Sequence, residues 1–404
     1  MKLRKLLFVG AYPPPYGGIA SHLHDLLPRL HDEGYEIVLL TLDQRSNAPQ
    51  PGYLKRIFIN TKEHFTSNRL KVLFSSFVSL RHKNEMPWQD FVRVATQADA
   101  INETAAREKV DAVFLYDNYN GFVIPMLKRL DRKRKLVLMI FGDFYLHPKK
   151  YLSLKRFMHN VFSNTDVILS SSRYCADSVD KVMGMDFPVQ VIYVGVDHDE
   201  YCRKDGSKMR ERLGIPPTAV VYSFLGRMNK SMGMDFLLKI APELLDISEE
   251  LYLLLAGAKG DLSAEVEALC AMHPRVRVCT DIPFEEKSDF YAASDVFMAP
   301  TMEKHACMGV SIKEAMACGR PVLASDSGGI PEAIENGLNG FMVPFGDGGV
   351  DRSVFVQRAR ELALDGAKRE ELGRNGREKV LRLFSNDETV RKYLAVIKTL
   401  EQMQ

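Results

Sequence analysis

Several features that would assign this 404-residue chain to a particular class are absent from its sequence. No run of about 18 apolar residues occurs, so no membrane-spanning helix is expected. The six cysteines show no C-x-x-C pair or metal-ligand spacing, which favours reduced thiols in a cytoplasmic protein. The basic and then apolar N-terminus lacks the cleavage site of a signal peptide, so residues 5–10 are predicted to form a buried first strand.

The charge of the chain is unevenly divided. Residues 1–195 hold 27 Lys and Arg against 19 Asp and Glu, a net charge of +8, whereas residues 196–404 hold 27 against 33, a net charge of −6. A basic half indicates either an anionic partner or an ordinary solvated surface. No nucleic-acid motif is present, so an anionic membrane surface or a phosphate-bearing acceptor is the preferred partner.

The most informative stretch runs from Asp295 to Pro344. Its pattern predicts alternating strands and helices over residues 295–300, 309–318, 321–325, 327 onward and 341–344. Such alternation is typical of a doubly wound parallel sheet, which binds ligands at the carboxyl ends of its strands. Two helix amino termini, near Gly309 and Gly329, would lie at that edge and offer backbone N–H groups to a diphosphate.

The wording of this stretch, EAMACG-RPV-ASD-GGIPE-IENG-NGF-VP, resembles the donor-binding core of family 4 glycosyltransferases. The likeness covers nearly the whole chain except residues 45–105. It implies the GT-B fold, an α/β architecture of two doubly wound Rossmann-like domains facing across a cleft. The implied domains are an acceptor-binding domain over residues 1–195, a nucleotide-sugar-binding domain over residues 196–384, and a final helix over residues 385–404 that packs back on the first domain.

In the family, an arginine and a lysine after the first strand of the second domain neutralise the phosphates of the departing nucleotide. Fixed cations there stabilise the charge that develops on the β-phosphate. Arg227 matches directly, but the lysine position holds Met232, so Lys230 is the substitute candidate, with a solvated loop residue as the alternative. The resemblance implies no metal and no cofactor, because these cations and the helix amino termini take the place of a metal ion.

Glu314 matches the family glutamate that accepts hydrogen bonds from the ribose hydroxyls, and an exposed helix glutamate is the alternative. The family's first glutamate, eight positions earlier, is replaced here by Ala306. Glu303 and His305 are the nearest substitutes for contact with the sugar. The remaining donor-binding candidates act through backbone groups: Met308, Gly309 and Val310 for the phosphates, and Ile282 for the base.

In the first domain, Gly17 and Gly18 match the glycine pair that the family places across the cleft from the donor diphosphate and beside the acceptor. A plain turn is the alternative. Phe141 stands where the family often has a histidine, so Asp143 or His147 would supply polar contacts, and Asp143 joins Arg227 and Lys230 as a catalytic candidate.

A basic run precedes the strand predicted at residues 136–141, and it is the candidate contact for a membrane or an acceptor phosphate. Its members are Lys128, Arg129, Arg132, Lys133, Arg134 and Lys135. A helix predicted over residues 69–83 has an apolar face and basic ends. It is read as facing the core in preference to lying on a membrane.

The sequence therefore predicts transfer of a sugar from a GDP- or UDP-linked donor to a glycan or lipid-linked acceptor, as in cell-surface polysaccharide biosynthesis. Retention at the anomeric carbon follows from the resemblance alone. A cytoplasmic location is expected, and peripheral attachment to the inner face of the membrane is the alternative. A nucleotide-sugar epimerase of the same fold would need a pair of carboxylates placed for proton abstraction, and the sequence shows no such pair. A non-catalytic nucleotide-sugar-binding subunit would explain Phe141, Met232 and Ala306, although an unusual donor sugar explains them better.

Overall fold

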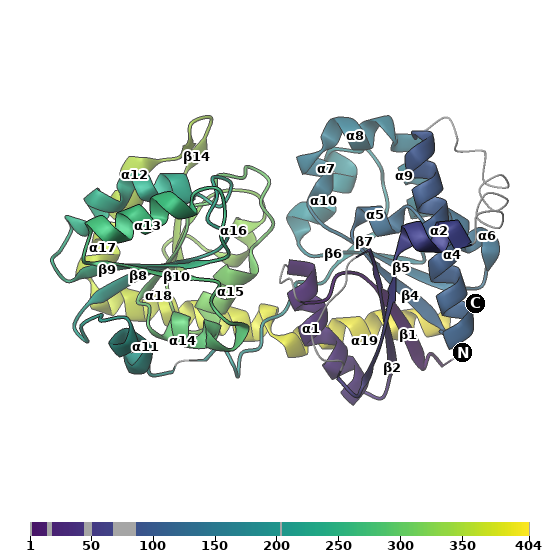
Figure 1. The fold of residues 1–404 in the computed structure, drawn as a ribbon, viewed down its shortest axis with the longest axis horizontal. Coiled ribbons are helices and arrows are strands. Elements are labelled where there is room, and N and C mark those ends of the chain that lie inside the picture. Colours follow the sequence, from purple (N-terminus) through teal and green to yellow (C-terminus); the bar gives the residue numbers. More distant parts are fainter. Residues whose placement is uncertain (1, 14–17, 44–50, 68–85, 203, 404) are drawn as a thin grey trace. The chain divides into compact units, whose positions relative to one another are not determined.

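The computed structural model describes residues 2–13, 18–43, 51–67, 86–202 and 204–403. The chain divides into two compact units (Figure 1). Unit 1 comprises Met1–Gly195 together with Asp387–Gln404, and unit 2 comprises Val196–Asn386.

Unit 1 is built on a seven-stranded sheet in which every neighbouring pair of strands is parallel. In spatial order the strands are β3 (Leu54–Ile59), β2 (Glu36–Leu42), β1 (Lys5–Val9), β4 (Ala112–Tyr116), β5 (Lys135–Ile140), β6 (Val167–Ser170) and β7 (Val189–Val191). The order reverses between β1 and β4, so the carboxyl ends of these two strands mark the switch point at which doubly wound sheets bind ligands.

Helices cover both faces of this sheet (Figure 1). They are α1 (Gly18–Asp32), α2 (Thr61–Ser67), α4 (Trp88–Glu108), α5 (Asn118–Gly121), α6 (Ile124–Leu130), α7 (Asp143–Leu146), α8 (Pro148–Ser153), α9 (Lys155–Ser163), α10 (Arg173–Lys181) and α19 (Asn386–Gln402). Successive strand residues point to opposite faces. Leu7 and Leu115 therefore pack with α4, α6 and α9, while Phe8 and Phe114 pack with α1 and α19.

The C-terminal helix α19, drawn in yellow in Figure 1, belongs to the core of unit 1. Its apolar face contributes Val390, Tyr393, Val396, Ile397 and Leu400. The Tyr393 hydroxyl lies 2.7 Å from the Tyr116 hydroxyl and 3.1 Å from Nε2 of His22. This buried polar bridge fixes α19 against β4 and α1.

Unit 2 is built on a six-stranded parallel sheet. In spatial order its strands are β10 (Val276–Thr280), β9 (Leu251–Gly257), β8 (Val220–Leu225), β11 (Val296–Ala299), β12 (Val322–Ser325) and β13 (Gly340–Val343), and a small antiparallel hairpin adds β14 (Phe345–Gly346) and β15 (Gly349–Val350). Its helical segments are α11 (Ser207–Arg212), α12 (Met234–Leu245), α13 (Ser263–Met272), η2 (Phe284–Glu286), α14 (Lys287–Ala292), α15 (Val310–Ala317), α16 (Ile330–Ala333), α17 (Arg352–Leu364), α18 (Gly366–Lys379) and η3 (Val380–Phe384).

The predicted fold class, two doubly wound α/β units, is confirmed. The strands and helices predicted between Asp295 and Pro344 appear as β11, α15, β12, α16 and β13. The edge strand β3 and the long helix α4 were not predicted, because neither carries a strong pattern. The helix predicted over residues 69–83 lies outside the described residues. Within the described part of the chain, no helix is long and apolar enough to cross a membrane.

Candidate functional site

The loops at the carboxyl edge of the unit 2 sheet are tied to one another by hydrogen bonds. Oγ1 of Thr301, after β11, donates to the carbonyl of Ser231, after β8, at 3.0 Å. The backbone N–H of Met302 donates to the same carbonyl at 2.9 Å. Oγ of Ser325, at the end of β12, donates to the carbonyl of Thr301 at 3.0 Å. Three loops that carry predicted donor-binding residues are therefore held in one arrangement.

Two glycines permit this close packing of backbone on backbone. Gly233 has a φ of +87°, and a Cβ atom there would lie 1.9 Å from the Pro300 carbonyl oxygen. Gly328 has a φ of +55°, and a Cβ atom there would lie 2.0 Å from the carbonyl oxygen of Ala306. Both positions require glycine for conformation and for space. They fix the distance between the loops.

Helices α12 and α15 both begin at this edge, after Gly233 and Gly309, and neither has a side-chain cap. By contrast, α17 and α18 are capped by the carboxylates of Asp351 and Asp365. The first N–H groups of a helix lack partners within the helix, so an uncapped amino terminus suits a bound anion. α15 thus presents the backbone of the predicted cradle, Met308, Gly309 and Val310. α16 spans only four residues and contributes less dipole.

Arg227 and Lys230 are both exposed on the loop after β8, and neither forms an ion pair with another residue in the described part of the chain. Met232 instead turns its side chain inward. Its Cε atom lies close to Gly226, and its side chain packs against the unit 2 core. The loop is held by Asn229, whose Oδ1 accepts from the backbone N–H of Met232 at 3.1 Å. The structure therefore leaves two cations available for phosphate, both of them predicted.

Glu314 is buried, with 3% of its surface exposed, and both of its oxygens already have partners in unit 2. Nζ of Lys287 lies 2.5 Å from Oε1, and the hydroxyl of Tyr291 donates to Oε2 at 2.7 Å. Glu314 is therefore not the exposed helix glutamate of the alternative interpretation. A carboxylate retains further lone pairs beyond these two bonds, so a ribose hydroxyl can still be accepted.

Lys287, Tyr291 and Lys313 are residues that sequence reasoning missed. Lys313 precedes Glu314 in α15 and is 2% exposed, and its burial lowers its pKa to about 7. Burial and the neighbouring Glu314 raise the pKa of Tyr291 well above its usual value, so it stays a hydrogen-bond donor. A lysine inside the apolar run of α15 was the one available signal. The contacts of Lys287 and Tyr291 with Glu314 join different helices and leave no local pattern.

The segment between β11 and α15 carries the candidates Glu303 and His305, and both are partly exposed. The Ala306 N–H donates to the Glu303 carbonyl at 3.2 Å, and the Ala306 carbonyl accepts from Gly329 N–H at 2.9 Å. Burial lowers the pKa of His305, and the nearby Lys304 lowers it further, so the imidazole is neutral at neutral pH. At the same edge, Ile282 follows β10 and is partly buried.

A separate groove of about 660 Å³ lies elsewhere in unit 2, and no predicted donor-binding residue lines it. Its lining includes Lys204, Asp205, Arg210, Glu211, Ile215 and Arg320. Donor binding is therefore assigned to the loop edge by its chemistry, not by the size of this groove.

At the carboxyl edge of the unit 1 sheet, two carboxylates lie close enough to influence one another. Asp117 follows β4 and has a φ of +78°, which is unusual for a residue with a side chain. Its side chain accepts from the backbone N–H of Asn120 at 2.8 Å. Burial raises the pKa of Asp117 to about 6, and the charge of Asp143 adds to this rise. Burial also raises the pKa of Asp143, against the opposing effect of His147 and Lys150.

Asn118 and Tyr151 bring further polar atoms to the same place. Both residues are fully buried, and the Asn118 amide and the Tyr151 hydroxyl have no hydrogen-bond partner of good geometry among the described residues. The pKa of Tyr151 is raised by burial and by the charge of Asp143. Unsatisfied buried polar atoms are costly and commonly mark a place for water or a ligand. Of this cluster, sequence reasoning found only Asp143.

A groove of about 480 Å³ borders this cluster in unit 1. It is lined by Asp90, Arg93, Val94, Gln97, Tyr119, Phe122 and Lys150. Nζ of Lys150 lies 4.2 Å from the centre of the Tyr119 ring. The groove therefore offers Lys150, an aromatic face and the ion pair of Arg93 with Asp90, whose atoms lie 3.0 Å apart.

The glycine pair of unit 1 is only partly described. Gly17 lies outside the described residues. Gly18 is exposed, begins α1, and has open space where a side chain would extend.

The basic run is divided between structural and exposed residues. Nζ of Lys128 donates to Oδ2 of Asp166 at 2.7 Å and to the Arg134 carbonyl at 2.8 Å, which fixes the start of β5. Arg134 is buried and donates to Asn102, and Lys135 donates to the Met403 carbonyl. Arg129, Arg132 and Lys133 are exposed. They precede β5, so they lie at the amino edge of the sheet, opposite the carboxylate cluster.

Comparison with known proteins assigns the chain to a family. Residues 16–200 match the family model described as "Glycosyltransferase Family 4", and residues 219–363 match the model described as "Glycosyl transferases group 1". The chain belongs to the family 4-like glycosyltransferases. One model matches in each unit, so both halves of the chain carry the family pattern.

Curated relatives of this chain are named as glycosyltransferases. A D-inositol 3-phosphate glycosyltransferase of Kribbella flavida is 25% identical over 89% of this chain and 85% of its own length. One from Catenulispora acidiphila is 30% identical over 52% of this chain. The match to that relative spans 51% of the relative's length, and the match to one from Streptomyces bingchenggensis spans 47%.

Solved structures confirm the GT-B fold of this chain. Sucrose-phosphate synthase from Thermosynechococcus elongatus aligns with a TM-score of 0.77 at 16% identity, covering 99% of both chains. HepE from Anabaena, in complex with UDP and glucose, aligns with a TM-score of 0.72 at 18% identity, covering 98% of this chain and 100% of its own.

The first prediction concerns Glu314. Glu314→Ala leaves the buried Tyr291 hydroxyl without its acceptor and the partly buried Lys287 without its carboxylate, so unit 2 should lose about 1–3 kcal/mol of stability. Glu314→Gln keeps an acceptor for Tyr291 and should lose less, yet both variants should bind UDP and GDP more weakly by calorimetry. Glu378→Ala, an exposed glutamate on α18, is the control. A melting temperature of Glu314→Ala equal to that of the parent would contradict a stabilising contact of Glu314 with Lys287 and Tyr291.

The second prediction concerns Asp117. Because its pKa is raised to about 6, the folded state holds the proton more tightly than the unfolded state, whose aspartate pKa is about 3.9. Stability should therefore fall as pH rises from about 4 to 6. Asp117→Asn should remove this slope and stabilise the protein at pH 7 by on the order of 2–3 kcal/mol. Urea titrations at pH 4, 6 and 7 measure the free energy of unfolding of the parent and of Asp117→Asn. The exposed Asp186→Asn is the control, and an Asp117→Asn variant less stable than the parent at pH 7 would contradict the prediction.

Proposed function

We propose that this glycosyltransferase moves a sugar from a UDP- or GDP-linked donor to a hydroxyl of a glycan or lipid-linked acceptor. The observation that carries the proposal is the unit 2 edge, where exposed Arg227 and Lys230 occupy a loop tied to the segment that leads into uncapped α15. Solved structures of HepE with UDP and with UDP-glucose share this fold, which supports a nucleotide sugar as donor.

The departing nucleoside diphosphate determines what these groups must do. As the bond between the sugar and the β-phosphate breaks, negative charge builds on the phosphate oxygens. Arg227 suits this charge through its paired N–H groups, and Lys230 acts as a point charge. The N–H groups of α15 stabilise the same charge without reorganising. We propose that these groups serve without a metal ion at the donor site, and that the anomeric configuration is retained.

We place the acceptor in unit 1, at the cluster of Asp117, Asp143, Asn118 and Tyr151. Ionised carboxylates accept hydrogen bonds from hydroxyl groups, and the buried amide of Asn118 offers both a donor and an acceptor. Lys150 in the bordering groove suits an anionic group on the acceptor, whereas Arg93 there already pairs with Asp90. The relatives are named for D-inositol 3-phosphate, so a polyol phosphate is the first acceptor class to test, beside glycans and lipid-linked sugars.

The test uses the parent protein and four variants, measuring release of UDP or GDP from the corresponding sugar donors. Arg227→Ala should lower kcat by roughly a hundredfold or more, as loss of an oxyanion-type contact does. Lys230→Ala should lower kcat more than it raises KM, because the charge that it meets grows in the transition state. Lys230→Ala with Met232→Lys should regain turnover, since residue 232 reaches Gly226 in the same loop. Exposed Lys239→Ala on α12 is the control.

The outcomes separate catalysis from binding alone. If the parent binds UDP or GDP in a calorimeter but releases no nucleotide from any donor sugar, the chain is the non-catalytic nucleotide-sugar-binding subunit. If Lys230→Ala turns over like the parent, Lys230 is a surface residue, and the phosphate relies on Arg227 and the helix amino termini.

We further propose that unit 1 touches an anionic membrane surface through exposed Arg129, Arg132 and Lys133, which flank the exposed Leu130. Each cation near such a surface contributes about 1 kcal/mol. Arg132→Glu with Lys133→Glu should abolish sedimentation with anionic vesicles at low salt. Lys239→Glu with Arg360→Glu, a matched change in unit 2, should not. Equal sedimentation with neutral vesicles, or no effect of salt, would contradict this contact.

A further inference from the structure

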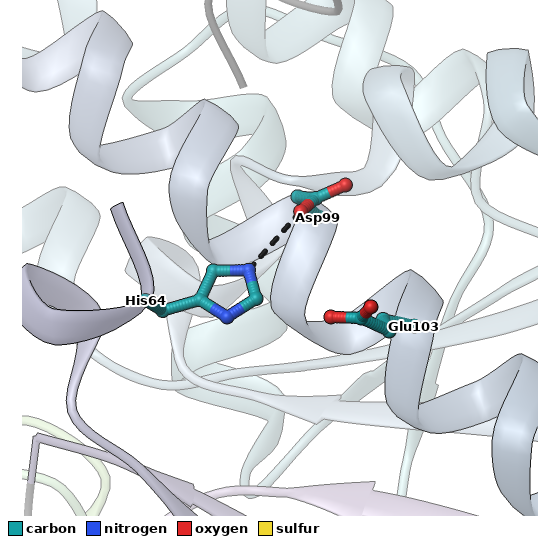
Figure 2. Close-up of side chains that lie close together, drawn as sticks. All are labelled: His64, Asp99 and Glu103. Carbon is teal, nitrogen blue, oxygen red and sulfur yellow. Dashed lines mark hydrogen bonds and ion pairs between the residues drawn. The ribbon is translucent and has the colours of Figure 1, made fainter. Parts of the chain in front are cut away.

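Outside the donor and acceptor clusters, unit 1 brings together a histidine and two carboxylates from two helices. Figure 2 shows His64 of α2 facing Asp99 and Glu103 of α4. Nε2 of His64 lies 3.1 Å from Oδ2 of Asp99. One potential ligand atom from each residue lies within 4.8 Å of the other two. No family match or relative's name assigns a role to this cluster.

The fold positions each member of the cluster. Asp99 and Glu103 are four residues apart on α4, so their side chains share one face of the helix. α2 follows the edge strand β3 and is anchored by Asp43, which accepts from the backbone N–H and the hydroxyl of Thr61 at 2.7 and 2.6 Å. This anchor holds His64 over the same face of α4. The cluster is thus built by tertiary packing between segments 35 residues apart.

The chemistry of the three side chains suits one class of ligand. Imidazole nitrogen and carboxylate oxygen together are typical ligands of zinc and similar divalent transition ions. Ligand atoms around a tetrahedral zinc ion are about 3.4 Å apart at the usual bond lengths. The His64 to Asp99 distance is already near this value, and an oxygen of the exposed Glu103 lies within 4.8 Å of the ligand atoms of both. Only 10% of the His64 side chain and 4% of the Asp99 side chain are exposed, so two ligands are largely withdrawn from water.

We propose that His64, Asp99 and Glu103 bind a divalent transition-metal ion of the zinc class. The ion cross-links α2 to α4, neutralises the buried carboxylate of Asp99, and keeps a fourth position for water. The site belongs to unit 1 and contains no residue of the donor or acceptor clusters. It therefore does not depend on the proposed sugar transfer, and it is compatible with a donor site that works without metal.

The test is a calorimetric titration of the full chain with zinc chloride after treatment with a chelator. The background is Cys307→Ser, because the exposed Cys307 thiol in unit 2 would bind zinc on its own account. One zinc ion should bind per chain. Glu103→Gln should weaken this binding by at least about tenfold, since it removes a charged ligand from an exposed position without disturbing the fold. The matched control is Glu63→Gln, which changes an exposed glutamate beside His64 on α2.

Two further measurements identify the ligands. Cobalt in place of zinc should give visible absorption bands that change in Glu103→Gln and disappear in His64→Ala. Saturating zinc should raise the melting temperature of the parent by on the order of 5 °C, and that of Glu103→Gln by clearly less. The proposal is overturned if no zinc binds at 100 times the protein concentration, or if Glu103→Gln binds as tightly as Glu63→Gln. The histidine and Asp99 then form only a structural hydrogen bond between the helices.

Discussion

The buried carboxylate of Glu314 is the interaction on which the donor side of this molecule depends. It receives Lys287 and Tyr291 from α14, so it joins α14 to α15, the helix whose amino terminus is proposed to bind the phosphates. The ion pair with the partly buried Lys287 stabilises little in itself, but removing Glu314 would leave the buried Tyr291 hydroxyl without an acceptor, which is costly. The position of α15, and with it the backbone of Met308 to Val310, is therefore coupled to the side chain assigned to the ribose.

In unit 1, by contrast, the candidate site gathers features that lower the stability of the fold. Asp117 occupies a backbone conformation with positive φ, its pKa is raised by burial, and its neighbours Asn118 and Tyr151 keep unsatisfied polar atoms. Each of these features costs stability, and together they lie at the carboxyl ends of β4 and β5. Strain and unsatisfied groups persist where the surrounding fold imposes them, commonly at functional sites. The rigid parallel sheet of unit 1, with α19 fixed through Tyr393, supplies that support.

The sequence could predict what depends on local pattern. The strands between Asp295 and Pro344, the glycine turns and the helix amino termini follow from periodicity and from residue types that few conformations accept. The sequence could not predict Lys287 beside Glu314, or Asp117 beside Asp143, because these contacts form between elements that are separate along the chain. It predicted one basic run at residues 128–135, yet packing uses Lys128 and Arg134 inside unit 1 and leaves Arg129, Arg132 and Lys133 exposed.

The three departures from the family pattern have different physical consequences. Met232 and Phe141 carry apolar side chains that pack against the cores of their units, so both positions are stabilised by burial. Ala306 lies in a turn. Its carbonyl oxygen packs against Gly328 and accepts a hydrogen bond from the backbone N–H of Gly329. Its small side chain adds no bulk to this crowded backbone, while Glu303 and His305 remain beside it. Ala306 removes a charge from the part of the site assigned to the sugar, and Met232 removes one from the part assigned to the diphosphate, where Arg227, Lys230 and α15 remain. The retained phosphate-binding groups fit nucleotide binding both in a transferase with an altered donor sugar and in a non-catalytic subunit, so turnover of the donor is the property that distinguishes the two.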